Sequence, residues 1–427
     1  MKTLFENVRI LKMTGEDIFF GELVVTNNRI TYIGKSAPKD EKYDRIINGE
    51  GNLLMPTFKN AHTHSAMSFL RSYADDMPLN DWLFKHCIPL EGYLTPDDVY
   101  ELSKISFLEY LTSGIGACFD QYYYPWSIAK AANDIGIRTT ILATYTSYLT
   151  KDQLREMYKE MNKDDDSLAH YCFGVHAEYT VSEEELDVMN ELVHEFKAPF
   201  YTHLSETESE VKGCYDRRGI SPVKYLIDKG VYDFGGGAYH CIWMSDEDLQ
   251  MFKDHNLTIV TNPGSNSKLA SGVADIERIR KFGINLAIGT DGPASNNCLD
   301  MFKEMMLVAN LSKLKYMDPS VTPAEEVLKM ATVGGAKAMG LKDADILEVG
   351  KYADIIMIDL NRPSMQPINN IVKNIVYAGG KDIIKMTMVN GKILYKDGKF
   401  FVNEDIKDIY QKCQQITDRI KKQGLNK

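Results

Sequence analysis

The sequence lacks the features of several large classes of protein. No stretch of 18 apolar residues occurs in it, so we expect no membrane-spanning segment. Charged residues interrupt every apolar run near the N-terminus, where a signal peptide would need a continuous one. The 49 lysines and arginines are outnumbered by 60 aspartates and glutamates, and a net charge of −11 should repel phosphate backbones. We therefore expect a cytoplasmic protein that binds neither membranes nor nucleic acid, with a small molecule as its partner.

Cysteine is also sparse. The seven cysteines are an odd number, and no two of them form a C-x-x-C pair. This pattern argues against a disulfide framework and against a structural zinc knuckle. We expect buried, reduced thiols.

The two ends of the chain share a β-rich texture. Residues 1–52 alternate apolar and polar positions between short turns, and the same texture returns after residue 346, where Asn390-Gly391 is typical of a hairpin turn. We therefore predict one small β-sandwich-like domain built from residues 1–52 and 346–403. Residues 404–427 are charged and helical in pattern, which predicts a C-terminal helical tail.

The middle of the chain, residues 53–345, alternates short apolar strands with longer amphipathic stretches. This alternation predicts βα units around a parallel sheet, and eight strands indicate an α/β fold of the (β/α)₈ TIM-barrel type. Six of the eight have a histidine or aspartate at or just past the carboxyl end, the rim on which such barrels place catalytic groups. The predicted strands centre on residues 53–62, 116–122, 139–144, 171–176, 199–203, 237–241, 258–261 and 286–290.

Histidines and carboxylates at these strand ends form a pattern suited to a metal. In Asn60-Ala-His62-Thr-His64, positions i and i+2 of an extended strand point the same way, so both imidazoles can reach one ion. By itself the H-x-H motif also fits two surface or core histidines.

Three further motifs follow at the ends of strands five, six and eight. His203 ends the fifth strand with Glu206 just beyond it, His240 ends the sixth, and Asp291 follows the eighth. Each alone fits a core histidine, a solvated glutamate or a helix-capping aspartate. Their order along the chain, together with the H-x-H motif, predicts a metal site.

This ordered set resembles the amidohydrolase superfamily. Three longer stretches are very similar to the 5-methylthioadenosine/S-adenosylhomocysteine deaminases, and the resemblance covers nearly the whole chain. They are residues 60–83, which begin Asn-Ala-His-Thr-His-Ser, residues 262–272 (Asn-Pro-Gly-Ser-Asn-Ser-Lys-Leu-Ala-Ser-Gly) and residues 289–297 (Gly-Thr-Asp-Gly-Pro-Ala-Ser-Asn-Asn).

The resemblance implies one divalent metal per chain. Nitrogen and carboxylate ligands with an open position suit catalytic Zn²⁺, although Fe²⁺ and Mn²⁺ accept similar ligands. Binuclear members of the superfamily use a carboxylated lysine at the end of strand four, and no lysine lies here between Lys163 and Lys197. The implied ligands are His62, His64, His203 and Asp291.

The resemblance also implies catalytic roles. Asp291 would accept a proton from the attacking water, Glu206 would pass a proton to the ring nitrogen, and His240 would orient the nucleophile. Glu91 matches a glutamate that holds ribose hydroxyls in the relatives, although it also fits a solvated helix end. Trp82 would pack against the substrate, although an ordinary core role fits it equally well. The implied substrate-binding residues are Glu91, His176, Glu206 and Trp82.

The resemblance predicts metal-dependent hydrolytic deamination of an adenine nucleoside, with release of ammonia. An aminohydrolase for another heterocycle, such as guanine, a pterin or a triazine, shares the metal site and is the main alternative. A non-catalytic scaffold of the same fold would have lost these ligands. His176-Ala-Glu178 also fits the H-x-E of cytidine-type deaminases, but the required P-C-x-x-C is absent. The oligomeric state stays open, with a homo-oligomer one of the alternatives.

The far end of the substrate is the hardest to predict. Relatives acting on S-adenosylhomocysteine place arginines in the loop after strand three to hold its carboxylate, but residues 144–155 offer only Lys151 and Arg155 here. Arg138 precedes the strand and should lie on the opposite side of the barrel. Without a bidentate arginine, discrimination in favour of a carboxylate should be weak. Aromatic residues are abundant nearby instead: Tyr122, Tyr123, Tyr124, Trp126, Tyr145 and Tyr148.

Overall fold

A parallel eight-stranded sheet lies at the centre of the protein. The structure, a computed structural model, describes residues 1–143 and 149–425. The strands follow one another in chain order from β6 to β13, and all neighbours are parallel. Beyond β13, Thr290 N donates to Asn60 Oδ1 at 2.8 Å and Asp291 N donates to the His62 carbonyl at 3.0 Å, so the last strand joins the first. The predicted (β/α)₈ barrel is confirmed.

The strands of the barrel agree with the predicted ones in number and order. They are β6 (Phe58–Thr63), β7 (Ile115–Gln121), β8 (Arg138–Ala143), β9 (Ala169–Ala177), β10 (Phe200–Leu204), β11 (Gly236–His240), β12 (Thr258–Thr261) and β13 (Asn285–Ile288). Thr144, predicted to end the third strand, lies outside the described residues.

The first predicted strand is in fact two. Leu53–Pro56 forms β5, which pairs with β1 (Lys2–Ile10) and β14 (Ile355–Ile358) in the other sheet, and the chain passes through Thr57 into β6. Both halves are fully buried and only Thr57 separates them, so no exposed turn marks the change of sheet. Periodicity alone therefore could not locate the break.

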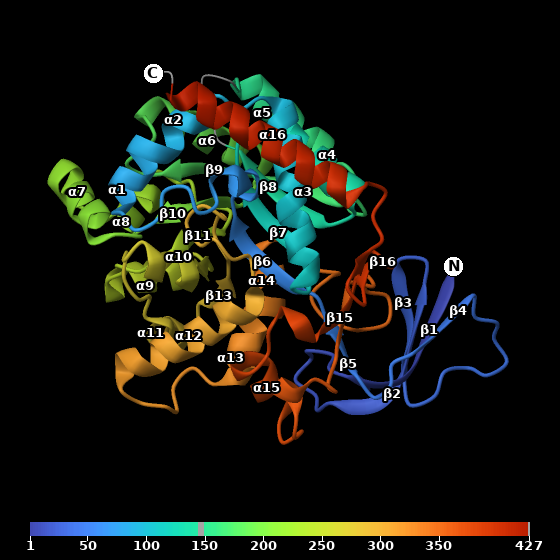
Figure 1. The fold of residues 1–427 in the computed structure, drawn as a ribbon. Coiled ribbons are helices and arrows are strands. Elements are labelled where there is room, and N and C mark those ends of the chain that lie inside the picture. Colours follow the sequence, from blue (N-terminus) through green and yellow to red (C-terminus); the bar gives the residue numbers. More distant parts are fainter. Residues whose placement is uncertain (144–148, 426–427) are drawn as a thin grey trace.

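Helices cover the outside of the barrel (Figure 1). Those following strands β7 to β12 are α4 (Pro125–Ile135), α5 (Lys151–Met161), α6 (Glu183–Phe196), α7 (Glu208–Arg218), α8 (Pro222–Asp228), α9 (Asp246–Asp254), α10 (Pro263–Lys268) and α11 (Ile276–Phe282). After β13 come α12 (Met301–Tyr316), α13 (Ala324–Lys329) and α14 (Gly335–Ala338). Several begin at capping boxes, as at Thr150, Ser182 and Ser245, where a hydroxyl and an acid or amide three residues on satisfy the first free N–H groups.

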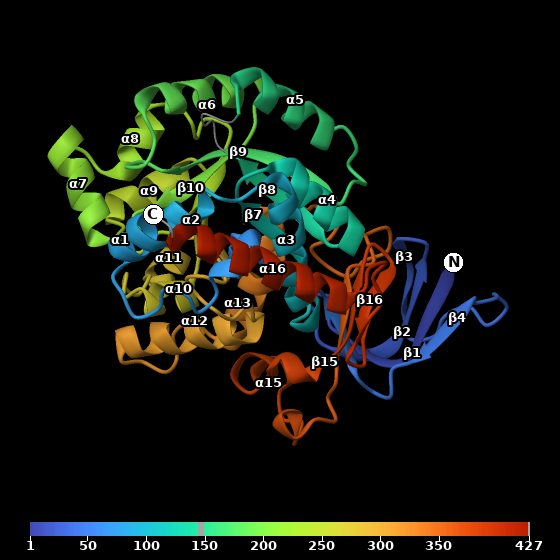
Figure 2. The same cartoon turned by 45° about the horizontal axis from the view of Figure 1, so that its top comes forward.

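A long excursion after β6 covers part of the barrel mouth. It contains two short helical turns, a six-residue π-helical turn at Trp82–Cys87, and α2 (Ile88–Glu91), before α3 (Pro96–Thr112) leads to β7. The C-terminal helix α16 (Ile406–Leu425) runs from the second sheet, which the chain ends form, across α3 to α2 (Figure 2). Buried Ile409, Cys413 and Ile420 form its inner face, so α16 supports the excursion from outside.

The chain ends build a second, nine-stranded sheet. Its N-terminal strands are β1, β2 (Phe19–Thr26), β3 (Arg29–Gly34), β4 (Arg45–Asn48) and β5; its C-terminal strands are β14, β15 (Ile384–Val389), β16 (Lys392–Lys396) and β17 (Lys399–Phe400). Asn390 and Gly391, with φ of 50° and 74°, form the predicted hairpin turn between β15 and β16. Domain limits at residues 52, 346 and 404 stay a prediction, and β5 lies in this sheet although it follows residue 52.

A buried ion pair joins the barrel to the second sheet. Arg138 Nε, at the start of β8, lies 2.6 Å from Asp354 Oδ2, and both side chains are at most 2% exposed. Asp354 Oδ1 also accepts from Asn390 N at 2.8 Å in the hairpin turn. Arg138 therefore lies at the amino end of the barrel, away from the rim, as the sequence predicted.

Removing this carboxylate should be strongly destabilising. We expect Asp354→Ala to lower the free energy of unfolding by about 3–5 kcal/mol, because Arg138 would stay buried without its partner. Asp343→Ala is the matched control: it removes an exposed partner of Arg29, and such pairs contribute about 0–1 kcal/mol. Urea unfolding measures both, and equal effects of the two substitutions would contradict the prediction.

Two further expectations concern cysteines and membranes. All seven cysteines are free thiols; six are buried, and Cys298 is half-buried. Within the described ranges, no helix combines the length and the apolar character needed to cross a membrane.

Candidate metal centre and substrate cavity

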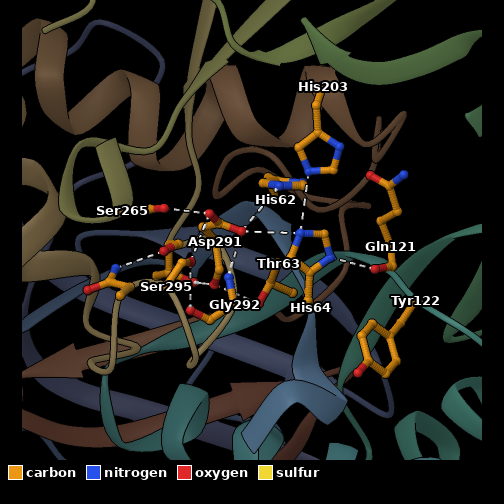
Figure 3. A network of polar contacts seen from close by, with 12 residues as sticks. His62, Thr63, His64, Gln121, Tyr122, His203, Ser265, Asp291, Gly292 and Ser295 are labelled. Carbon is orange, nitrogen blue, oxygen red and sulfur yellow. Dashed lines mark hydrogen bonds and ion pairs between the residues drawn. The ribbon is translucent and has the colours of Figure 1, made fainter. Parts of the chain in front are cut away.

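Four side chains converge at the carboxyl-end rim of the barrel (Figure 3). Asp291 Oδ1 lies 3.5 Å from His62 Nε2 and 3.2 Å from His64 Nε2. His64 Nε2 and His203 Nε2 are 3.4 Å apart. Ligands held about 2.0–2.1 Å from a tetrahedral ion lie about 3.3–3.4 Å from one another. These three separations are those expected between ligands of one cation. The ligand atoms of His62, His64 and Asp291 form one compact group and those of His62, His203 and His240 another, so the two groups meet at His62.

Backbone carbonyls fix the histidine rings. His64 Nδ1 donates to the Gln121 carbonyl at 2.6 Å, and His203 Nδ1 donates to the His176 carbonyl at 2.6 Å. A carbonyl only accepts, so each Nδ1 carries a proton and the lone pair of the neutral ring belongs to Nε2. Such outer contacts are typical of metal-bound histidines. Neither nitrogen of buried His62 has a hydrogen-bond partner, which leaves a ligand atom free for an ion.

The electrostatics around Asp291 favour a positive charge beside it, while burial lowers the pKa of His62 to about 3 and that of His203 well below its usual range, which keeps both imidazoles neutral. Burial by itself would lower the pKa of His64, but the contact with Asp291 raises it to about 9. Burial would raise the pKa of Asp291, yet its contacts with His62 and His64 hold it well below the usual range. The residues present thus fit a divalent cation.

Asp291 is held firmly. Its Oδ2 accepts from Ser265 Oγ at 2.6 Å and Ser295 Oγ at 2.9 Å, and its Oδ1 accepts from Gly292 N at 2.7 Å. Its φ of 60° lies in the left-handed region, which non-glycine residues seldom adopt. Strain of this kind concentrates at functional sites.

Glu206 and His240 lie beside the four groups. Glu206 Oε1 is 3.8 Å from His240 Nδ1 and accepts from Ser271 Oγ at 3.3 Å. The His240 ring is held by Asn266 Oδ1, 2.7 Å from Nδ1, so its Nε2 is the free nitrogen. Burial raises the pKa of Glu206 and favours its protonated form. A buried carboxylic acid next to a fixed imidazole can give and take protons.

Three of the four groups, His64, His203 and Asp291, line a cavity of about 450 Å³, a size typical of small-molecule sites. Its lining is largely aromatic and aliphatic and includes Trp82, Phe84, Tyr122, Tyr123, Tyr124 and Tyr179. Four carboxylates also line it: Glu91, Glu185, Glu206 and Asp291. No lysine or arginine is among the described residues of the lining, and residues 144–148, which follow lining residue Ala143, contain none.

The three other residues expected to bind substrate lie in this lining. His176 and Trp82 both face the cavity, and Glu91 Oε1 accepts from Tyr122 Oη at 2.6 Å. Burial raises the pKa of Glu91 and lowers that of His176 to about 4. His176 is therefore a neutral imidazole at physiological pH.

Several nearby candidates lie elsewhere. Glu178 turns away from the cavity to pair with Arg217 and Arg218 at 2.6 and 2.8 Å. Trp126 is half exposed and outside the lining. Tyr145 and Tyr148 lie outside the described residues.

The structure adds residues that sequence reasoning missed. Gln121 contributes a backbone carbonyl, which its side-chain identity cannot reveal. Ser265, Asn266 and Ser271 lie in the stretch 262–272 that carries the family resemblance, yet a serine or an asparagine there fits any loop.

Comparison with known proteins agrees with the barrel and its rim. A family model with the description "Amidohydrolase family" matches residues 53–394. The chain belongs to the amidohydrolase family. It is thereby a metal-dependent hydrolase, and the predicted resemblance to the amidohydrolase superfamily is confirmed.

Relatives that match nearly the whole chain are named as deaminases. A "5-methylthioadenosine/S-adenosylhomocysteine deaminase" of Thermoanaerobacter pseudethanolicus is 40% identical over 93% of this chain and 94% of its own. A "5′-deoxyadenosine deaminase" of Methanosarcina mazei is 34% identical over 98% of each chain. The crystal structure of an adenosine deaminase from Xanthomonas campestris with bound zinc has a TM-score of 0.91, 27% identity and 98% coverage of both chains.

Proposed function

We propose that this protein deaminates an adenine nucleoside hydrolytically, with one divalent metal, Zn²⁺ by preference, held by His62, His64, His203 and Asp291. The observation that carries this is that three pairs of ligand atoms 3.2–3.5 Å apart link these four side chains at the rim, beside the buried acid Glu206. The deaminases similar to this chain over nearly its whole length support the reaction type.

The residues divide the chemistry between them. A divalent metal, when bound, makes a water molecule acidic enough to attack near neutral pH. Asp291 accepts one proton from the attacking water. The hydroxide that remains adds to the ring carbon that bears the amino group. Glu206 donates its proton to the adjacent ring nitrogen, while His240 orients the attacking oxygen through its free Nε2. The proton held by Asp291 then passes to the amino group, the carbon–nitrogen bond breaks and ammonia leaves. The hydroxyl group on that carbon gives its proton to the Glu206 carboxylate and becomes a ring carbonyl.

The cavity supplies recognition. Aromatic side chains can stack on the purine and cover it from water. Glu91, already accepting from Tyr122, keeps a second carboxylate oxygen for the hydroxyls of a ribose. His176, neutral at physiological pH, adds a hydrogen-bonding ring without a charge.

The lysine and arginines nearest in sequence to the end of strand β8 form ion pairs outside the cavity. Lys151 pairs with Glu191, and Arg155 pairs with Glu195 at 2.7 Å, both on helix α6. Arg138 is buried at the other end of the barrel. A substrate carboxylate would therefore meet carboxylates in this cavity and no arginine.

We expect uncharged nucleosides to match or exceed S-adenosylhomocysteine in kcat/KM. The experiment measures ammonia release from 5′-methylthioadenosine, 5′-deoxyadenosine, adenosine and S-adenosylhomocysteine side by side. A preference of about a hundredfold or more for S-adenosylhomocysteine corresponds to about 2.7 kcal/mol in transition-state binding. It would show that the cavity does have a residue that binds the substrate carboxylate. Turnover of guanine, with none of any adenosine, would overturn the nucleoside assignment itself.

A further inference from the structure

Glu210 is a buried acid that the proposed chemistry does not use. It lies on the first turn of α7, is 7% exposed, and is absent from the cavity lining. No lysine or arginine in the described part of the chain forms an ion pair with it. Burying a carboxyl group without a cation is costly, and an acid at an exposed position of the same turn would serve the helix dipole equally well.

The carboxylate of Glu210 folds back onto the backbone that carries Glu206. Its Oε1 accepts from Ser205 N at 2.6 Å, and its Oε2 accepts from Glu206 N at 2.8 Å. The backbone of Thr207 also interacts with it. Successive N–H groups thus surround the carboxylate as an anion nest.

The same turn is fixed from its other side. The Ser205 carbonyl accepts from Ile242 N at 3.0 Å and from Trp243 N at 2.9 Å, in the loop that follows His240. Ser205 has a φ of 51°, a left-handed conformation that needs such support. The Glu206 side chain leaves this turn toward Ser271 and His240.

We propose that Glu210 is a positioning residue that holds the Ser205–Glu206 turn so that the Glu206 carboxyl group faces the reacting ring. This inference rests on the proposed role of Glu206. Glu210 lies outside the cavity lining and the ligand cluster, so its influence on the reaction passes through the Ser205–Glu206 turn. Burial and the nearby Glu206 raise the pKa of Glu210 to about 7, which agrees with two acids sharing one buried turn.

Glu210→Gln is the informative substitution. The glutamine keeps one oxygen that can accept, but turns an NH₂ group toward the other backbone N–H, so the turn must shift. Displacements of about 1 Å can cost about 10²-fold in rate. We expect kcat to fall about 10- to 100-fold, while KM changes less than about threefold and the metal content is unchanged. Glu208→Gln, an exposed acid on the same helical turn, is the matched control and should keep the wild-type rate.

A double-mutant cycle separates positioning from general structural damage. If Glu210 acts only by placing Glu206, Glu206→Gln and the double variant Glu206→Gln/Glu210→Gln should have equal kcat within about threefold. The same fractional loss from Glu210→Gln in both backgrounds would overturn the inference, as would a wild-type kcat for Glu210→Gln alone. Wild-type turnover by Glu206→Gln would instead remove the proposed role of Glu206, and this inference with it.

A second variant covers the case in which Glu210→Gln does not fold. Thr207→Ala removes the hydroxyl that accepts from Glu210 N at 3.1 Å and loosens the start of the helix without changing a charge. Its smaller loss of kcat should likewise vanish in the Glu206→Gln background. A loss that persists there would overturn the inference.

Discussion

Glu206→Gln is expected to keep the metal and to lose about 10²- to 10⁴-fold in kcat, the usual contribution of a proton-transferring group. The glutamine has nearly the same shape and can still accept from Ser271 Oγ, but it carries no proton to deliver to the ring. The metal ligands lie outside this change. Steady-state kinetics on 5′-methylthioadenosine and elemental analysis of the same preparation measure both quantities.

The control for this result is Glu208→Gln, which neutralises an exposed acid two residues away. It should leave kcat and metal content at wild-type values. Wild-type turnover by Glu206→Gln would show that the proton travels through another group, and loss of metal from that variant would mean that Glu206 is a ligand.

His203→Ala is expected to abolish both metal binding and turnover. His203 supplies the one nitrogen of the cluster that comes from β10, and its Nδ1 is already committed to the His176 carbonyl. Without it, a cation keeps ligands only from the neighbouring ends of β6 and β13. Wild-type protein should contain one metal per chain, and the variant well below one. His194→Ala, which removes an exposed histidine of α6, should change neither quantity.

Removal of the metal offers an independent check on this assignment. A chelator should reduce turnover of the wild-type protein to background, and added Zn²⁺ should restore it, because the attacking water depends on the ion for its acidity. Two metals per chain, or full turnover without metal, would refute the single-metal site.

The sequence predicted the barrel because its strands and helices have different hydrophobic periods, which a linear pattern records. It predicted the ligands because parallel strands bring their carboxyl ends to one rim, so motifs at strand ends must meet there. His62 and His64 share a strand at a spacing of two, and His203 and Asp291 follow at the ends of later strands. The extent predicted for the first strand was wrong because β5 and β6 are both buried and no exposed turn separates them.

Only the tertiary structure determined how the proposed ligands are held. The groups that orient His64 and His203 are backbone carbonyls of Gln121 and His176, and any residue could supply them. His176 and Glu178 are two residues apart near the end of β9, yet one lines the cavity and the other pairs with two arginines of α7. Glu91 reaches the cavity from an excursion that no periodicity predicts. The sequence by itself determined the chemical groups and the rim on which they meet, because both follow from local pattern. The roles proposed for single groups, such as the nitrogen that would face an ion and the acid that would face the substrate, depend on contacts between segments far apart in the chain.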